Sequence, residues 1–144
     1  MGMKMAVFLP GALLCASPVQ AQDTPEKALI ASGVEAYVNG DATAAMKVWL
    51  KGSALEGNTQ AMSQANNLHQ VEDFYGKPQG FDLIAARTIS AHCRLVYFAI
   101  NYTKGPLFCR FQLFETAPGR WVATEVKFHT EVTNVFPSSM TDPR

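Results

Sequence analysis

The sequence predicts an α+β protein in which three N-terminal helices pack on a curled antiparallel sheet of about four strands. Two observations carry this prediction. Up to Gly76 the apolar residues recur at intervals of three and four, which is the spacing of one face of a helix. After Gly80 the chain is rich in β-branched and aromatic residues and is interrupted at short intervals by turn signals, which is typical of strands.

Each of the three helices is also predicted from its ends. A polar residue that can accept a hydrogen bond from the first turn precedes each helix, and a glycine follows each one. In chain order, these residues are Thr24 and Gly40, Asp41 and Gly52, and Asn58 or Thr59 and Gly76.

Four strands are predicted at about 81–90, 92–102, 107–115 and 120–130. A two-residue turn at Lys104-Gly105 and a four-residue turn before Arg120 have even lengths, so both place the apolar residues of three strands on one face. This register pairs Ile100 with Cys109 and Glu115 with Arg120. The predicted core face consists of Val96, Phe98, Ile100, Cys109, Phe111, Leu113, Val122, Val126 and Phe128.

The opposite face of the predicted sheet is also aromatic. It carries Leu95, Tyr97, Phe108, Phe114 and Trp121 beside Arg110, Gln112, Glu125 and Lys127. Aromatic side chains on both faces of a sheet indicate that both faces are covered. We expect a second copy to cover this one through Tyr97, Phe108, Phe114 and Trp121, which gives a homodimer. The alternative is that loops or the C-terminal tail cover it.

The first 21 residues have the pattern of a cleavable signal peptide. Lys4 precedes a short apolar run, and Val19-Gln20-Ala21 places a small residue where a signal peptidase cuts. The run is too short to cross a bilayer of about 30 Å as a helix. We therefore expect a periplasmic or secreted protein with no membrane contact in its mature form. Residues 22–136 are predicted to form one domain, followed by a loose tail at 137–144.

Composition argues against several kinds of partner. The chain has 12 basic and 12 acidic residues, so it lacks the excess of positive charge that a nucleic-acid-binding face requires. His69, His92 and His129 are too scattered to predict a metal site, and no motif for a cofactor is present. Cys93 and Cys109 are predicted to be free thiols, because the expected register separates them by roughly 23 Å.

Three stretches carry a family resemblance. Phe74-Tyr75-Gly76-Lys77-Pro78-Gln79-Gly80-Phe81 leaves the third helix, and Lys104-Gly105-Pro106-Leu107 and Gly119-Arg120-Trp121 make later turns. With the order of helices and sheet, they resemble small exported bacterial members of the nuclear transport factor 2-like superfamily, whose fold is cone-like. The resemblance covers residues 24–136. Its motifs are structural, and the fold does not fix the function.

The resemblance implies a pocket between the helices and the concave face of the sheet. Members similar to ketosteroid isomerase use a buried acid there as a base, often with a tyrosine or a second acid. Here Asp82 and Glu125 lie off the predicted core face, and Glu115 is on it but at a hairpin end. Tyr75, within the matching stretch, is a candidate ligand-binding residue of this pocket.

A second group of candidates comes from the register itself. Arg94 is expected directly across from Glu115, and Glu115 across from Arg120, all at one end of the core face. Two guanidinium groups around one carboxylate leave spare donors that suit a carboxylate or phosphate ligand. The alternative is an ion-pair cluster at the rim with little energetic value.

The sequence favours a non-catalytic binding or structural role for an exported module whose pocket takes a small molecule. A small isomerase-type or hydratase-type enzyme using the same pocket is the first alternative. An adaptor that binds a protein partner through its helical face is the second.

The signal-peptide pattern predicts that the exported protein begins at Gln22, with or without cyclisation to pyroglutamate. The intact mass of material recovered from the host, together with N-terminal sequencing, tests this prediction. A mass that includes residues 1–21 contradicts it.

Overall fold

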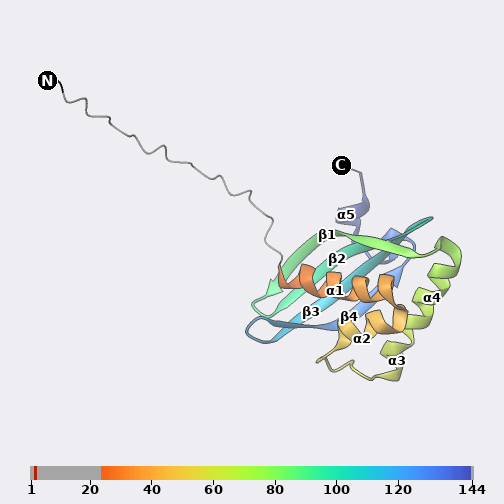
Figure 1. Cartoon of the computed structure of the whole chain (residues 1–144), viewed down its shortest axis with the longest axis horizontal. Coiled ribbons are helices and arrows are strands. Elements are labelled where there is room, and N and C mark those ends of the chain that lie inside the picture. The colour runs from red at the N-terminus through yellow and green to blue at the C-terminus, as the bar shows by residue number, and fades with distance from the viewer. Residues whose placement is uncertain (1, 3–23, 144) are drawn as a thin grey trace.

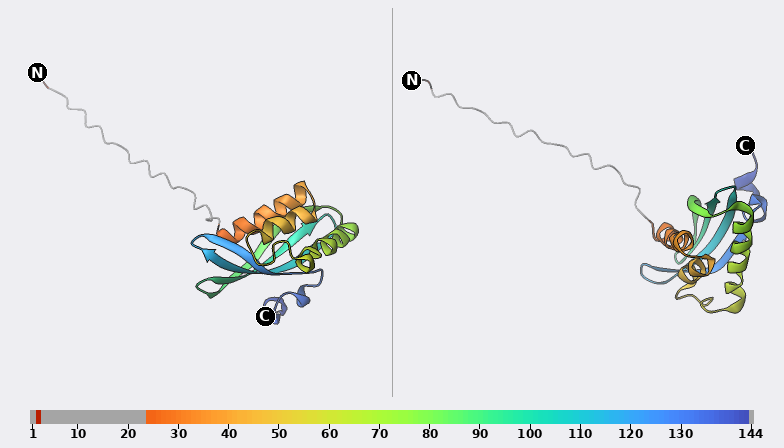
Figure 2. Two further views of the ribbon diagram at one scale, coloured as in Figure 1. Left: turned by 90° about the horizontal axis from the view of Figure 1, so that it is seen from below. Right: turned by 45° about the vertical axis from the view of Figure 1, so that its right-hand side comes forward.

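The computed structural model describes residue 2 and residues 24–143, so the predicted signal peptide and its cleavage site lie outside the described residues. Within them the chain is an α+β domain, as predicted. Helices cover one face of a curled, unclosed, four-stranded antiparallel sheet, and the C-terminal segment lies on the other face (Figures 1 and 2).

The first two helices begin where the sequence predicts. Helix α1 is Pro25–Asn39, and the Thr24 hydroxyl oxygen accepts a hydrogen bond from the Lys27 amide at 3.3 Å. Helix α2 is Ala42–Leu50, and the Asp41 carboxylate accepts from the Ala44 amide at 2.8 Å. Each cap satisfies a backbone donor that the first helical turn leaves unpaired.

The third predicted helix is two helices. Helix α3 is Thr59–Met62, capped by Asn58, and helix α4 is Gln64–Tyr75. Ser63 separates them because its hydroxyl donates to the Gln60 carbonyl at 2.6 Å, a local bond that competes with regular helix pairing. Gly76, with φ at +85°, ends α4 and turns the chain into the sheet.

The sheet is an antiparallel meander in the order β1-β2-β3-β4. Its strands are β1 (Pro78–Ser90), β2 (Cys93–Tyr102), β3 (Pro106–Ala117) and β4 (Arg120–His129). A short 3-10 helix (Val132–Asn134) and helix α5 (Ser138–Thr141) follow β4.

The register between β2 and β3 differs from the prediction by two residues. Phe98 pairs with Cys109, and Ile100 pairs with Leu107, because the pair nearest the turn is Asn101 with Pro106, with four residues between them, instead of the predicted Thr103 with Pro106 and two between. The loop length is still even, so every side chain keeps its predicted face. Cys93 and Cys109 are free thiols, as predicted.

Two irregularities change the faces between β3 and β4. The turn holds two residues, and the register shifts at Thr116 and again at Thr124. Between these points the alternation is displaced, so Trp121 joins the core cluster, and Val122, which is 3% exposed, is buried near Gly52. The predicted outer-face position of Trp121 is therefore wrong, whereas Val122 is buried and Val126 and Phe128 pack against the core, as predicted.

Trp49 fills the centre of the space between helices and sheet. Its fully buried indole packs against Phe98, Phe111 and Phe128, with ring centroids 5.1–6.4 Å away. Its Nε1 donates to the Ile30 carbonyl at 3.4 Å. The central part of the predicted pocket is therefore occupied by the protein's own side chains.

The outer face of the sheet is covered by the protein's own C-terminal segment. Phe136 packs edge-on against Tyr97 and Phe108, with centroids 5.2 and 5.6 Å away, and Val135 and Met140 complete this cluster. Tyr97 is only 4% exposed. Residues 132–136, with Met140 of α5, thus cover Tyr97 and Phe108, which is what the alternative to a dimer face expects, while the homodimer itself stays a prediction. Of the four residues proposed for that face, Phe114 is the one that stays exposed.

We predict that Phe136→Ala lowers the free energy of unfolding by about 3 kcal/mol, because it empties the cluster that covers Tyr97 and Phe108. The matched control is Phe74→Ala. Phe74 is 80% exposed, so its truncation changes stability by less than about 0.5 kcal/mol. Urea unfolding of both variants measures the difference, and equal effects would show that the tail does not stabilise the sheet.

Candidate functional site

The predicted cluster of Arg94, Glu115 and Arg120 does not form. Arg94 pairs across the sheet with Leu113, and its guanidinium makes an ion pair with Glu26, in the first turn of α1. It also stacks over the Trp121 ring, 4.4 Å from the ring centroid. Arg94 therefore ties the start of α1 to β2 and β4 and is engaged within the protein.

Glu26 is a buried carboxylate held in its ionised form. Burial raises the pKa of Glu26, but its own backbone amide, the Thr24 hydroxyl and the Arg94 guanidinium outweigh burial and lower the pKa below its ordinary value of 4.5. Arg94 binds one carboxylate oxygen, and the other is buried without a hydrogen-bond partner in the described chain.

Glu115 and Arg120 lie apart from this pair. The Glu115 carboxylate is 3.5 Å from His92 Nδ1 and accepts from the Gly119 amide at 3.4 Å, so it closes the β3–β4 turn. Arg120 pairs with Ala117 and is exposed. The turn holds two residues instead of the predicted four, so Arg120 lies across from Ala117, and the register shift at Thr116 places Trp121 across from Glu115.

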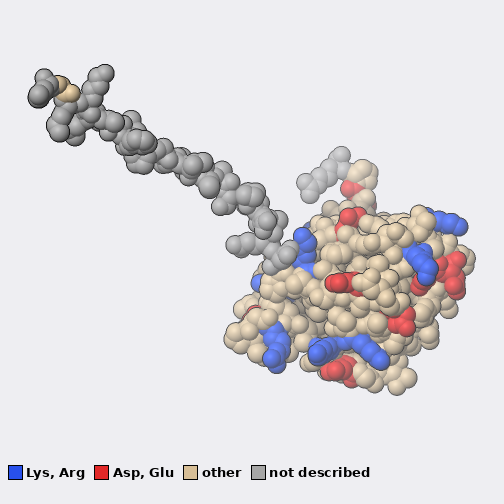
Figure 3. All heavy atoms as spheres, in the orientation of Figure 1, with Lys and Arg blue, Asp and Glu red and all other residues tan. Residues whose placement is uncertain are grey.

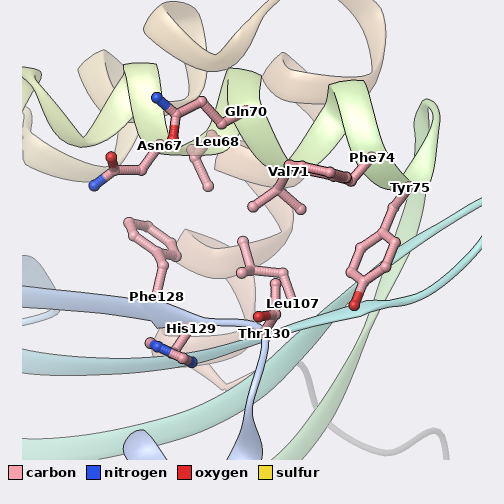
Figure 4. Close-up of a pocket in the computed structure, with 10 residues that line it drawn as sticks. All are labelled: Asn67, Leu68, Gln70, Val71, Phe74, Tyr75, Leu107, Phe128, His129 and Thr130. Carbon is pink, nitrogen blue, oxygen red and sulfur yellow. The ribbon is translucent and has the colours of Figure 1, made fainter.

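Tyr75, by contrast, does line a cavity. A cavity of about 450 Å³ lies between α4, the start of β3 and the end of β4 (Figure 4). Leu68, Val71, Leu107 and Phe128 give it apolar walls. The remaining lining residues are Asn67, Gln70, Phe74, Tyr75, His129 and Thr130.

The wall that α4 provides is set by buried tyrosines. Tyr102 donates to the Tyr37 hydroxyl oxygen, and Tyr37 donates to the Leu68 carbonyl of α4, both at 3.0 Å. Burial raises the pKa of Tyr37 to about 12, and burial with the contact to Tyr37 raises the pKa of Tyr102 still more. Both phenols stay protonated and act as structural donors that join α1, β2 and α4.

Tyr75 is placed by a close approach to the β2–β3 loop. Its ring lies over Gly105, where a Cβ would come within 2.8 Å of the ring carbons, and 6.3 Å from the Tyr102 ring. A side chain at residue 105 would displace Tyr75. Figure 4 shows Tyr75 extending from the end of α4 toward Leu107 and Thr130.

His129 borders the cavity at the end of β4, but its ring is turned toward the segment that follows the strand. Its Nδ1 accepts from the Glu131 amide at 2.9 Å, so the neutral ring carries its proton on Nε2. Asn134 lies beside the ring and donates to the Glu131 carboxylate at 3.0 Å. Asn134 Nδ2 also lies 3.3 and 3.4 Å from the two ring nitrogens, so the ring is held beside the 3-10 helix.

Sequence reasoning placed only Tyr75 of these residues at a site. It missed Val71, Leu107, Phe128 and His129, because the predicted pocket was centred on the sheet, where Trp49 lies. One signal was present. Leu68, Val71 and Tyr75 recur at helical spacing on one side of α4, and Phe128 and His129 end the last strand.

Other site classes find no support in the described part of the chain. Residues 24–143 contain no group of three histidine, cysteine, aspartate or glutamate side chains placed to hold a metal ion. No described helix is both long enough and apolar enough to cross a membrane. Comparisons with protein-family models, curated proteins and solved structures give no match for this chain.

The Glu26–Arg94 pair makes stability sensitive to acid. The pKa of Glu26 is lower in the folded state than in the unfolded state. The ionised carboxylate therefore contributes fully to the free energy of unfolding above pH 4.5, and this contribution is lost as the pH falls through the folded pKa. We predict that Glu26→Gln lowers stability at pH 7 by about 1–2 kcal/mol, a value reduced by the partial exposure of Arg94.

Unfolding of both proteins in urea between pH 7 and pH 3 measures this effect. The gap between wild type and Glu26→Gln closes below pH 4.5, whereas the control Glu35→Gln, on the exposed side of α1, changes little at any pH. A gap that persists unchanged at pH 3 shows that the loss comes from packing rather than charge.

Proposed function

We propose that this protein is an exported, non-catalytic module that binds a small, largely apolar molecule in the cavity between α4 and the ends of β3 and β4. The observation that carries the proposal is the cavity itself. Its volume of about 450 Å³ falls in the range of small-molecule sites, and apolar walls with a few polar groups at the edge are typical of them.

The lining residues define the chemistry of the ligand. Val71, Leu107 and Phe128 suit an aliphatic or aromatic body, which gains free energy by leaving water. The side-chain amides of Asn67 and Gln70 suit a carbonyl or ether oxygen. A neutral molecule with an apolar body and one acceptor oxygen fits this set.

The titratable groups favour binding over catalysis. Among the described residues that line the cavity there is no carboxylate, and the ionisable residues are Tyr75 and His129. The buried carboxylate of Glu26 is paired with Arg94, at the other end of the sheet from Tyr75. An isomerase-type mechanism needs a secluded base facing the substrate, and this arrangement does not favour one.

The cone-type architecture and the export of the protein belong to the same proposal. Helices followed by a curled, unclosed antiparallel sheet support the resemblance to nuclear transport factor 2-like proteins. In this proposal α4 and the adjoining strand ends form the mouth of the cone. The signal-peptide pattern of residues 1–21 supports delivery to the periplasm or the cell exterior.

Filling the cavity tests the proposal. N-phenyl-1-naphthylamine, a neutral apolar probe, should bind the wild type with enhanced fluorescence. Val71→Trp places an indole in the cavity and should weaken probe binding at least about tenfold, since several apolar contacts are lost. Val38→Trp adds the same side chain at an exposed position of α1 that does not line the cavity, and should leave binding unchanged.

Thermal melting of both variants confirms that they are folded before binding is compared. Equal probe binding by Val71→Trp and the wild type would contradict the proposal, as would a wild type that does not bind the probe. A protein partner captured by the exposed Phe74 instead of a small molecule would favour the adaptor alternative.

A further inference from the structure

A second cavity lies at the other end of the molecule from the first. It has a volume of about 500 Å³ and is bounded by α1, α2 and the start of β4. Its lining includes Leu29, Val48, Lys51, Arg120, Trp121 and Val122. It shares no lining residue with the cavity that contains Tyr75.

The floor of this second cavity is apolar. Leu29 and Val48 are half-buried on α1 and α2, and Trp121 is 9% exposed with the Arg94 guanidinium over its ring. Gly52, with φ at +80°, turns the chain after α2 so that its backbone lies against Val122. The floor is therefore assembled from three separate elements.

Two basic side chains lie at the edge of this apolar floor. Lys51 and Arg120 are exposed, and neither makes an ion pair with an acid of the described chain. Figure 3 shows basic side chains along the edge of the molecule where α2 lies.

The acids beside this cavity are already engaged. Glu56 accepts from the Gly52 amide at 2.9 Å, and Glu115 is held by His92 and the Gly119 amide. Glu26 is paired with Arg94 behind Trp121. Those carboxylates keep their negative charge, but none of them lines the cavity, whereas Lys51 and Arg120 do, so the charged groups in the lining are both cations.

We propose that this second cavity binds a small organic anion: a monocarboxylate whose apolar body lies on Trp121, Leu29 and Val48 and whose carboxylate is bound by Lys51 and Arg120. A guanidinium matches the two oxygens of a carboxylate, and an ammonium adds a point charge. The site is separate from the neutral-ligand cavity and does not depend on its function.

Octanoate is the probe, with octanol and octylammonium as matched molecules of the same chain length. Calorimetry gives the affinities, and the indole N–H resonance of Trp121, assigned with Trp121→Phe, reports the location. Octanoate should bind more tightly than both analogues and shift the Trp121 resonance. The Trp49 indole, buried and bonded to Ile30, should move little.

The double variant Lys51→Gln/Arg120→Gln should weaken octanoate binding about tenfold or more, because a hydrogen bond to a charged group is lost at each position. Both side chains are exposed, so the variant is expected to fold. The control is Lys77→Gln/Lys104→Gln, which removes the same charge at exposed positions beyond this cavity and should bind octanoate like the wild type.

Two outcomes overturn the proposal: octanoate binding that the first double variant does not weaken, or octanol binding as tightly as octanoate. The two cavities are tested independently. Val71→Trp should keep octanoate binding, and Lys51→Gln/Arg120→Gln should keep binding of N-phenyl-1-naphthylamine. Failure at one cavity therefore leaves the result at the other intact.

Discussion

The arrangement of this domain depends on the packing of Trp49. Its indole lies in the space between the helices and the sheet, and the Phe98, Phe111 and Phe128 rings surround it. The backbone of α1 also has to come close. A Cβ at Gly33 would overlap the indole, so only glycine allows α1 to pass there. One bulky side chain and one missing side chain thus fix how α1, α2 and the sheet approach each other.

Filling the centre in this way decides where space remains. With Trp49, Phe98 and Phe111 fully buried, the described cavities lie at the margins, where helices and strand ends diverge. The two margins have different chemistry. Near α4 the hydroxyl chain from Tyr102 through Tyr37 to Leu68 holds an apolar wall in place. Near the start of β4, cationic side chains border an apolar floor. A neutral ligand and an anionic ligand would therefore bind at opposite ends.

The sequence predicts the faces of the sheet better than its pairing. Side chains alternate with a period of two, so a register error of two residues leaves Phe98 and Phe111 in the core although neither has its predicted partner. The same argument fails for Trp121, because the irregularities at Thr116 and Thr124 displace the alternation between them. Both positions are threonines, so no glycine or proline there indicates a register shift in the sequence. Local alternation is thus readable from the chain, whereas the points where it slips are decided by the packing of both strands.

The candidate site shows the same division. The caps at Thr24 and Asp41 were predictable because each involves residues three apart in the chain. The Arg94–Glu26 pair joins residues 68 positions apart. Its formation depends on where the start of α1 meets the sheet, and no local pattern specifies that. The predicted triad of Arg94, Glu115 and Arg120 assumed a pairing that the shifted register removes.

For the outer face of the sheet, a long-range contact could have been predicted from the sequence. The need for a cover was readable from Tyr97 and Phe108, and the cover was also in the sequence, because Val132, Val135, Phe136 and Met140 recur at helical intervals. An intramolecular cover has an advantage over a second copy. Binding another molecule costs translational and rotational freedom, whereas a tethered segment loses only the freedom of its short connection. Where a chain carries an apolar segment directly after its edge strand, that segment should occupy the exposed face before a partner does.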